Sequence, residues 1–216
     1  MLHILGHQDE PLPHSFLQRE EETDHAVLIL PGGEAFAQHP ALYYGSLECM
    51  DRGADILWVG YNSRPQFASL SLEEKAVWAL QDSIAAYQTL LEQRAYRRLT
   101  FIAKSIGTLV LGHLLTELPR KTPVQAIWLT PLINRQDLRA QIYRAAQPSL
   151  FVIGTQDHFF DAASVQEVQE RSTEYGQMLL IEGADHGLEV GADGTDVLGS
   201  LQVLEQVMQA IQAFLR

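Results

Sequence analysis

The segment LTFIAKSIGTLVLGHLL, residues 99–115, decides how this chain folds. It opens with an apolar run, residues 99–103, that is typical of a buried strand, and it continues after Ser105 as an apolar stretch of helical length. A strand that turns abruptly into a helix at a serine presents the hydroxyl at the carboxyl edge of a sheet. Such a turn is sterically crowded, and the small residues Ala103 and Gly107 stand two positions before and after Ser105.

The same alternation of strand and helix recurs on both sides of this segment. Short apolar runs predict strands at residues 26–30, 54–60, 99–103, 124–130, 150–153 and 178–181. Helical patterns lie between and after them, near residues 40–52, 72–91, 106–118, 135–146, 162–171 and 197–214. Strands that are apolar on both faces and alternate with helices indicate an α/β fold, in which helices cover both faces of a mostly parallel central sheet. The polar first two dozen residues are ambiguous and could add one or two antiparallel edge strands.

Length and charge limit the kinds of protein this can be. With 216 residues, 46% of them hydrophobic, we expect one domain over residues 1–216. The formal net charge of −12 repels phosphate backbones and anionic lipids, so neither nucleic acid nor a membrane is an expected partner. A lone cysteine, Cys49, suits a reducing compartment, and no signal peptide is evident at the N-terminus. We therefore expect a cytoplasmic protein.

The turn at Ser105 resembles the nucleophile elbow of the α/β-hydrolase superfamily. The usual pattern is Gly-x-Ser-x-Gly, and Ala103-Lys-Ser-Ile-Gly107 departs from it at the first position, where alanine is small enough for the same turn. The resemblance runs from about Ala26 to the end of the chain and implies the α/β-hydrolase fold with Ser105 as nucleophile. In that superfamily an acid and then a histidine base follow the nucleophile, on loops after later strands.

Three histidines follow Ser105 in the chain. His113 falls within the helix after the nucleophile, and His158 adjoins the best candidate for the acid. His186 lies in a flexible loop after the last predicted strand, which is where the superfamily places its base. The resemblance therefore implies that His186 is the base.

The acid has one preferred candidate and two alternatives. Asp157 follows the strand at residues 150–153 after a short loop. Asp161 is the reserve, although its position is typical of a helix N-cap, and Asp185 adjoins the base itself. We expect Asp157 to orient His186.

An oxyanion hole needs backbone N–H groups aimed at the developing negative charge. Ile106, the residue after the nucleophile, is one expected donor. The turn Pro31-Gly-Gly-Glu34 after the strand at residues 26–30 resembles the glycine loops of the superfamily, so Gly33 is the preferred second donor and Glu34 the alternative.

These residues predict a serine hydrolase that cleaves a small ester or thioester. Only residues 131–148 separate two strands between which the superfamily often inserts a cap, so a large lid is not expected and the site should be open. No motif for a metal or nucleotide cofactor is present, and the oligomeric state is undefined. A non-catalytic binding protein on the same fold, or a lyase or acyltransferase with the same triad, stays an alternative. Further residues are candidates to line the site: Lys104, Tyr61, Asn62 and Phe159.

Overall fold

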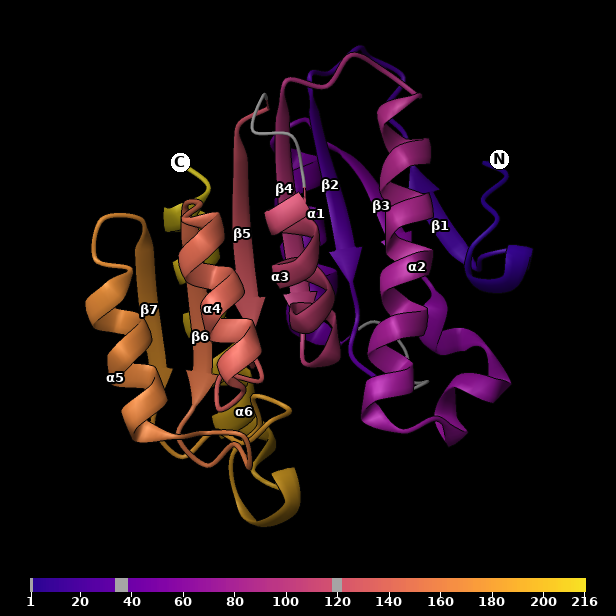
Figure 1. The fold of residues 1–216 in the computed structure, drawn as a ribbon. Helices are drawn as coiled ribbons and strands as arrows, with labels where there is room; N and C mark the ends of the chain where they lie inside the picture. Colours follow the sequence, from indigo (N-terminus) through magenta and orange to yellow (C-terminus); the bar gives the residue numbers. More distant parts are fainter. Residues whose placement is uncertain (1, 34–38, 118–121) are drawn as a thin grey trace.

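A seven-stranded sheet runs through the computed structural model, which describes residues 2–33, 39–117 and 122–216 (Figure 1). The strand order is β1-β3-β2-β4-β5-β6-β7. All neighbouring strands are parallel except β1 and β3, which are antiparallel. The strands are β1 (His14–Leu17), β2 (His25–Leu30), β3 (Asp55–Val59), β4 (Arg98–Lys104), β5 (Val124–Leu129), β6 (Ser149–Gly154) and β7 (Gly176–Ile181).

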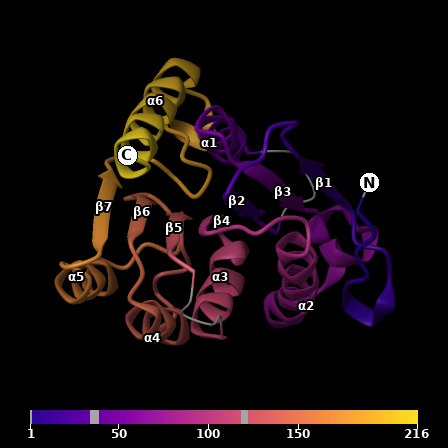
Figure 2. The same ribbon diagram turned by 90° about the horizontal axis from the view of Figure 1, so that it is seen from above.

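Helices cover both faces of this sheet. Seen from above, α1 and α6 lie on one face and α2, α3, α4 and α5 on the other (Figure 2). The α-helices are α1 (Pro40–Asp51), α2 (Leu72–Leu91), α3 (Ile106–Glu117), α4 (Gln136–Ala145), α5 (Ala162–Arg171) and α6 (Val197–Phe214). The described residues also contain short 3-10 helices: η1 (His7–Asp9), η2 (Tyr61–Ser63), η3 (Pro65–Ser69) and η4 (Ala192–Gly194). Each face has its own hydrophobic cluster, and every residue of β2 and β6 is buried, which explains their continuous apolar sequences.

The strand order reverses at β2, because β3 pairs on one side of it and β4 on the other. The helices that follow β2 and β4 therefore leave toward opposite faces, as α1 and α3 do in Figure 2. Such a reversal opens a crevice at the carboxyl ends of the two strands, where ligands bind in α/β proteins. Leu30 pairs with Ala103, so the loop after β2 begins beside Ser105.

The mostly parallel sheet covered by helices is confirmed, and the ambiguous N-terminal region supplies the antiparallel edge strand β1. The strand β7 begins at Gly176, two residues before its prediction, and it is only partly buried because it lies at the other edge of the sheet. Between β5 and β6 the chain forms only α4, so no lid is inserted there. Within the described ranges, no helix has both the length and the apolar character needed to cross a bilayer.

Candidate active site

Ser105 occupies the turn between β4 and α3 in a strained conformation. Its φ is +53°, in the left-handed region that residues with a side chain seldom adopt. The requirement for a small residue at position 107 is explained by the turn itself. A β-carbon on Gly107 would lie 2.3 Å from the carbonyl oxygen of Leu30. The turn therefore presses the start of α3 against the end of β2.

The structure brings Ser105, His186 and Asp157 into one hydrogen-bonded chain. The Nε2 atom of His186 is 2.8 Å from the Oγ of Ser105, and its Nδ1 atom is 2.8 Å from Oδ2 of Asp157. Asp157 is almost fully buried, and its other oxygen accepts the backbone N–H of Phe159 at 2.8 Å. Because an ionised carboxylate can only accept, the ring proton belongs on Nδ1, which leaves the Nε2 lone pair for the serine hydroxyl.

The alternative residues have other partners. Asp161 caps α5, as its position predicts, by accepting the N–H of Ser164 at 2.8 Å. Asp185 accepts the N–H groups of Gly187 and Glu189 within the loop that carries His186, at 2.7 and 3.0 Å. His113 is exposed on α3.

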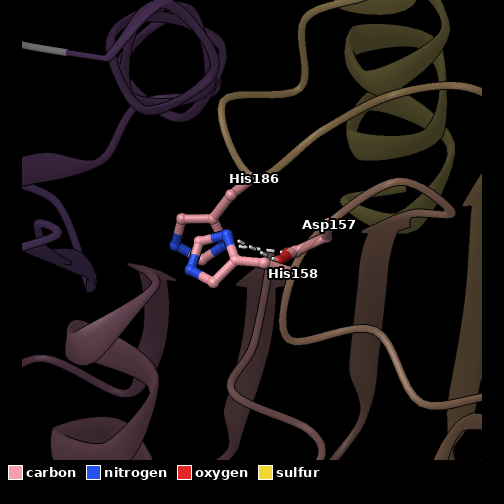
Figure 3. Close-up of side chains that lie close together, drawn as sticks. All are labelled: Asp157, His158 and His186. Atoms are coloured by element: carbon pink, nitrogen blue, oxygen red, sulfur yellow. Dashed lines mark hydrogen bonds and ion pairs between the residues drawn. The ribbon is translucent and has the colours of Figure 1, made fainter.

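His158 lies beside Asp157 and His186 (Figure 3). Its Nδ1 atom is 3.8 Å from Oδ1 of Asp157, and its ring centroid is 4.9 Å from that of His186. Among the residues that the structure describes, Asp157, His158 and His186 form a group whose ligand atoms all lie within 4.8 Å of one another. A metal ion there would have to replace the direct hydrogen bond between Asp157 and His186, so the arrangement as it stands fits proton transfer better than metal binding.

Two side chains bind the backbone of the loop that carries His186, which is called the base loop below. Lys104, itself buried, donates through Nζ to the His186 carbonyl oxygen at 2.8 Å and to Oγ1 of Thr130 at 3.3 Å. His39, at the N-cap of α1, lies with Nε2 2.7 Å from the Gly187 carbonyl oxygen. The two contacts hold the carbonyl groups of His186 and of the residue that follows it.

The ionisation state of His39 suits this contact. Burial, and after it the charge of Lys104, lowers the pKa of His39 from 6.5 to about 4, so the ring is neutral at pH 7. Its Nδ1 atom accepts the N–H of Ala41 at 3.3 Å, which places the ring proton on Nε2 and makes that atom the donor to Gly187.

The loops that carry Asp157 and His186 touch at Gly154, the last residue of β6. A β-carbon on Gly154 would lie 2.2 Å from the carbonyl oxygen of Ala184. Gly154 also pairs with Ile181 at the end of β7. The absence of a side chain at this position therefore lets the loop carrying Asp157 approach the loop carrying His186.

The two predicted oxyanion donors, Ile106 and Gly33, lie close to each other near Ser105. Ile106 is the first residue of α3, so its N–H has no partner within the helix. A β-carbon on Gly33 would lie 3.7 Å from the Ile106 side chain, which makes the two residues neighbours. Glu34, the alternative donor, lies outside the described residues.

The glycine loop is tied to η2 by two side chains. The Tyr61 hydroxyl donates to the Pro31 carbonyl oxygen, and Nδ2 of Asn62 donates to the Gly32 carbonyl oxygen at 3.1 Å. Since both carbonyls are held this way, residues 31–33 have a defined orientation next to Ser105.

A pocket of about 580 Å³ surrounds Ser105 and His186. Lys104 and Asn62 line it, as the sequence predicts. Tyr61 is instead fully buried beneath the glycine loop, and Phe159 packs with its ring centroid 5.1 Å from that of His186. His39 and Gln156 also lie in the pocket wall, although no sequence pattern predicts either residue there. The pattern before Pro40 is compatible with a helix N-cap, but nothing local signals the contact of His39 with a loop far along the chain.

Comparison with known proteins finds the likeness in structure only. No protein-family model and no curated protein matches the sequence. Esterase Pf2001 of Pyrococcus furiosus matches with a TM-score of 0.71 and 15% identity, over 99% of this chain and 90% of that chain. Est1E of Butyrivibrio proteoclasticus, solved with ferulic acid, matches with a TM-score of 0.74 and 12% identity, over 98% of this chain and 97% of that chain. A serine hydrolase without a lid from Xanthomonas campestris matches with a TM-score of 0.68 and 15% identity, over 99% of this chain and 93% of that chain. The fold predicted from the turn at Ser105 is confirmed over nearly the whole chain: this protein has the α/β-hydrolase fold.

Proposed function

We propose that the protein is a serine hydrolase that cleaves small esters or thioesters through an acyl-enzyme. The observation that carries the proposal is the unbroken chain of two 2.8 Å contacts from Ser105 through His186 to Asp157. A serine hydroxyl is a weak nucleophile until a base within hydrogen-bond reach removes its proton, and that base needs a partner that stabilises its positive charge. All three roles are filled by side chains at the carboxyl edge of the sheet.

The reaction has two halves. In the first, His186 takes the Ser105 proton as Oγ attacks the substrate carbonyl carbon, and the backbone N–H groups of Ile106 and Gly33 stabilise the oxyanion. His186 then gives that proton to the departing alcohol or thiol, which leaves an acyl ester on Ser105. In the second half, His186 takes a proton from water, the resulting hydroxide attacks the acyl ester, and the proton returns to Ser105 as the carboxylic acid leaves.

The environment of the site supports a small-molecule substrate. The pocket is open, and no lid is inserted between β5 and β6. The net charge of −12 argues against nucleic acid and anionic membranes as partners, and the free, buried Cys49 suits a cytoplasmic enzyme. Solved structures of this fold that carry the name esterase, at 12–15% identity, add support.

The test is labelling with a fluorophosphonate, which reacts only with an activated serine. We expect the wild-type protein to be labelled at Ser105 and the Ser105→Ala variant to remain unlabelled. The same substitution should lower ester turnover by roughly 10⁴-fold or more. Ser69→Ala is the control, because Ser69 is an exposed serine on η3 whose hydroxyl bonds to Gln66.

Each alternative gives its own result. A wild-type protein that resists the probe and leaves p-nitrophenyl acetate intact would be a binding protein on this fold, and the proposal would be wrong. Labelling at Ser105 together with acyl transfer to an added alcohol, but not to water, would identify an acyltransferase instead.

A further inference from the structure

A second cavity lies between α1, α6 and the loop that follows His186. Its volume is about 200 Å³. The floor is buried, since Ala41, Leu188 and Val207 are each no more than 5% exposed. The rim residues Val197 and Leu201 are 65% and 56% exposed. The apolar lining is Ala41, Leu188, Val197, Leu201, Leu204 and Val207. The cavity therefore offers an apolar group a buried floor. Binding of such a group would also cover the exposed apolar side chains of the rim, which is favourable because it removes apolar surface from water.

This cavity adjoins the pocket at Ser105. Four residues line both spaces: His39, Pro40, Gly187 and Glu189. Gly187 follows the base directly in the chain, so the shared wall begins one residue from the reacting centre. The two spaces differ in chemistry, because Lys104, Asn62 and Gln156 give the pocket at Ser105 a polar wall.

The size and charge of the cavity restrict its occupant. An aliphatic cavity of about 150 Å³ holds a benzene molecule, so this one has room for an apolar group of about six carbon atoms. The described residues that line it include no lysine or arginine, and the carboxylate of Glu189 stands on the shared wall. An acyl group that ends in a carboxylate would be repelled there.

We propose that this cavity binds the acyl chain of the substrate and gives the enzyme a preference for neutral, apolar acyl groups of about six carbons. This inference rests on the proposed function, because it assigns the acyl half of the ester to the space between α1 and α6. The leaving group then occupies the polar, open side of the pocket at Ser105.

The first measurement is kcat/KM for p-nitrophenyl esters from acetate to decanoate. We expect kcat/KM to rise about fourfold for each methylene up to about hexanoate, as each one leaves water, and then to stop rising. The monoester of adipic acid, which has six carbons and a terminal carboxylate, should react at least tenfold more slowly than the hexanoate. A profile that is flat or falls from acetate onward overturns the inference.

Two variants change the cavity in opposite directions. Leu204→Ala enlarges it from α6 and should move the optimum to chains two or three carbons longer. Ala41→Leu fills it from α1 and should move the optimum to acetate or propionate. Leu198→Ala is the matched control, because Leu198 lies on the same helix, is 74% exposed and is not part of the lining. If Leu204→Ala and Leu198→Ala have the same chain-length profile as the wild type, the inference is wrong, whether or not Ala41→Leu folds.

A binding measurement separates this inference from the proposed function. Binding of 1-hexanol to the Ser105→Ala variant, followed by calorimetry, needs no catalysis. We expect Ala41→Leu in that background to weaken binding at least tenfold and Leu198→Ala to leave it unchanged. Fluorophosphonate labelling of Ser105 with a flat ester profile would defeat the cavity assignment alone. Specific hexanol binding without labelling would defeat the hydrolase proposal and with it the acyl-chain assignment, and would leave the cavity as an apolar binding site.

Discussion

Asp157 and Asp161 lie on the same loop but have different partners. Asp157 contacts His186, whereas Asp161 caps α5. We expect Asp157→Asn to lower kcat by roughly 10⁴-fold, because an amide does not hold the imidazole in the tautomer that accepts the serine proton. Asp161→Asn should keep near wild-type activity, since asparagine is an equally good N-cap. Ester kinetics on both variants make the comparison, and equal losses would remove Asp157 from its role.

His39 offers a test of how the base loop is held. His39→Asn keeps a side chain that can cap α1 but cannot reach the Gly187 carbonyl oxygen, now 2.7 Å from Nε2. The loss of one such hydrogen bond corresponds to about 1 kcal/mol, so we expect kcat to fall roughly fivefold and the melting temperature to fall by only about 2–4 °C. His39→Ala loses the cap as well and should also melt earlier. Unchanged kcat in His39→Asn would show that the contact does not position the base.

At this scale the sequence predicts the residues whose roles follow from a local motif or from their order in the chain. Ser105 stands in a recognisable turn, and His186 stands in the loop where the superfamily has its base. His39 could not be found in this way, because its partner lies 148 positions away and only the packing of α1 against the base loop brings them together. Tyr61 was expected in the pocket wall, but its hydroxyl bonds to Pro31 and the ring is buried. A side chain's direction depends on tertiary packing, which the sequence does not state.

The start of α2 is the element with the clearest local signal. The Ser71 hydroxyl accepts the N–H of Glu74, and the Glu74 carboxylate accepts the N–H of Ser71 at 2.8 Å. We expect Ser71→Ala to lower the free energy of unfolding by about 1 kcal/mol, because the Glu74 N–H loses its acceptor and the Glu74 carboxylate loses the Ser71 hydroxyl. Urea unfolding measures the loss, and ester turnover should be unchanged. Ser69→Ala on η3 is the control and should stay within about 0.5 kcal/mol of wild type.

Periodicity predicts the type of each central element more reliably than its ends or its neighbours. The buried strands β2, β4 and β6 can be recognised in the sequence as apolar runs. Edge strands are harder, since β1 is half exposed and its four residues resemble a loop. The order of strands in the sheet is not written in any local pattern. It follows from which helix covers which face, and it puts β2 between β3 and β4.

For the whole molecule, buried histidines predict a loss of stability in mild acid. His25 at the start of β2 is 4% exposed, and its Nε2 lies 2.8 Å from Oγ1 of Thr100. Burial, and after it Arg98, lowers the pKa of His25 from 6.5 to about 4. Between pH 4 and pH 6.5 the unfolded chain therefore binds a proton at His25, whereas the folded protein does not. The stability due to neutral His25 is present above pH 6.5 and is lost as the pH falls toward 4.

The size of this effect can be measured against a variant. Between pH 7 and pH 5 the free energy of unfolding should fall by about 2 kcal/mol through His25 alone. In His25→Asn this component is missing, so the variant should lose about 2 kcal/mol less over the same interval, even if it is less stable at pH 7. Urea unfolding at pH 7, 6 and 5 gives both slopes, and parallel slopes would contradict the assignment.

The left-handed backbone at Ser105 has a consequence for engineering this protein. A residue with a side chain in that conformation costs about 1 kcal/mol, which glycine would not. A screen for heat resistance alone would therefore favour glycine at this position. It would return proteins that are more stable but lack the Ser105 hydroxyl. Substitutions meant to raise the thermal stability should therefore leave the turn between β4 and α3 unchanged and be placed at surface sites remote from it.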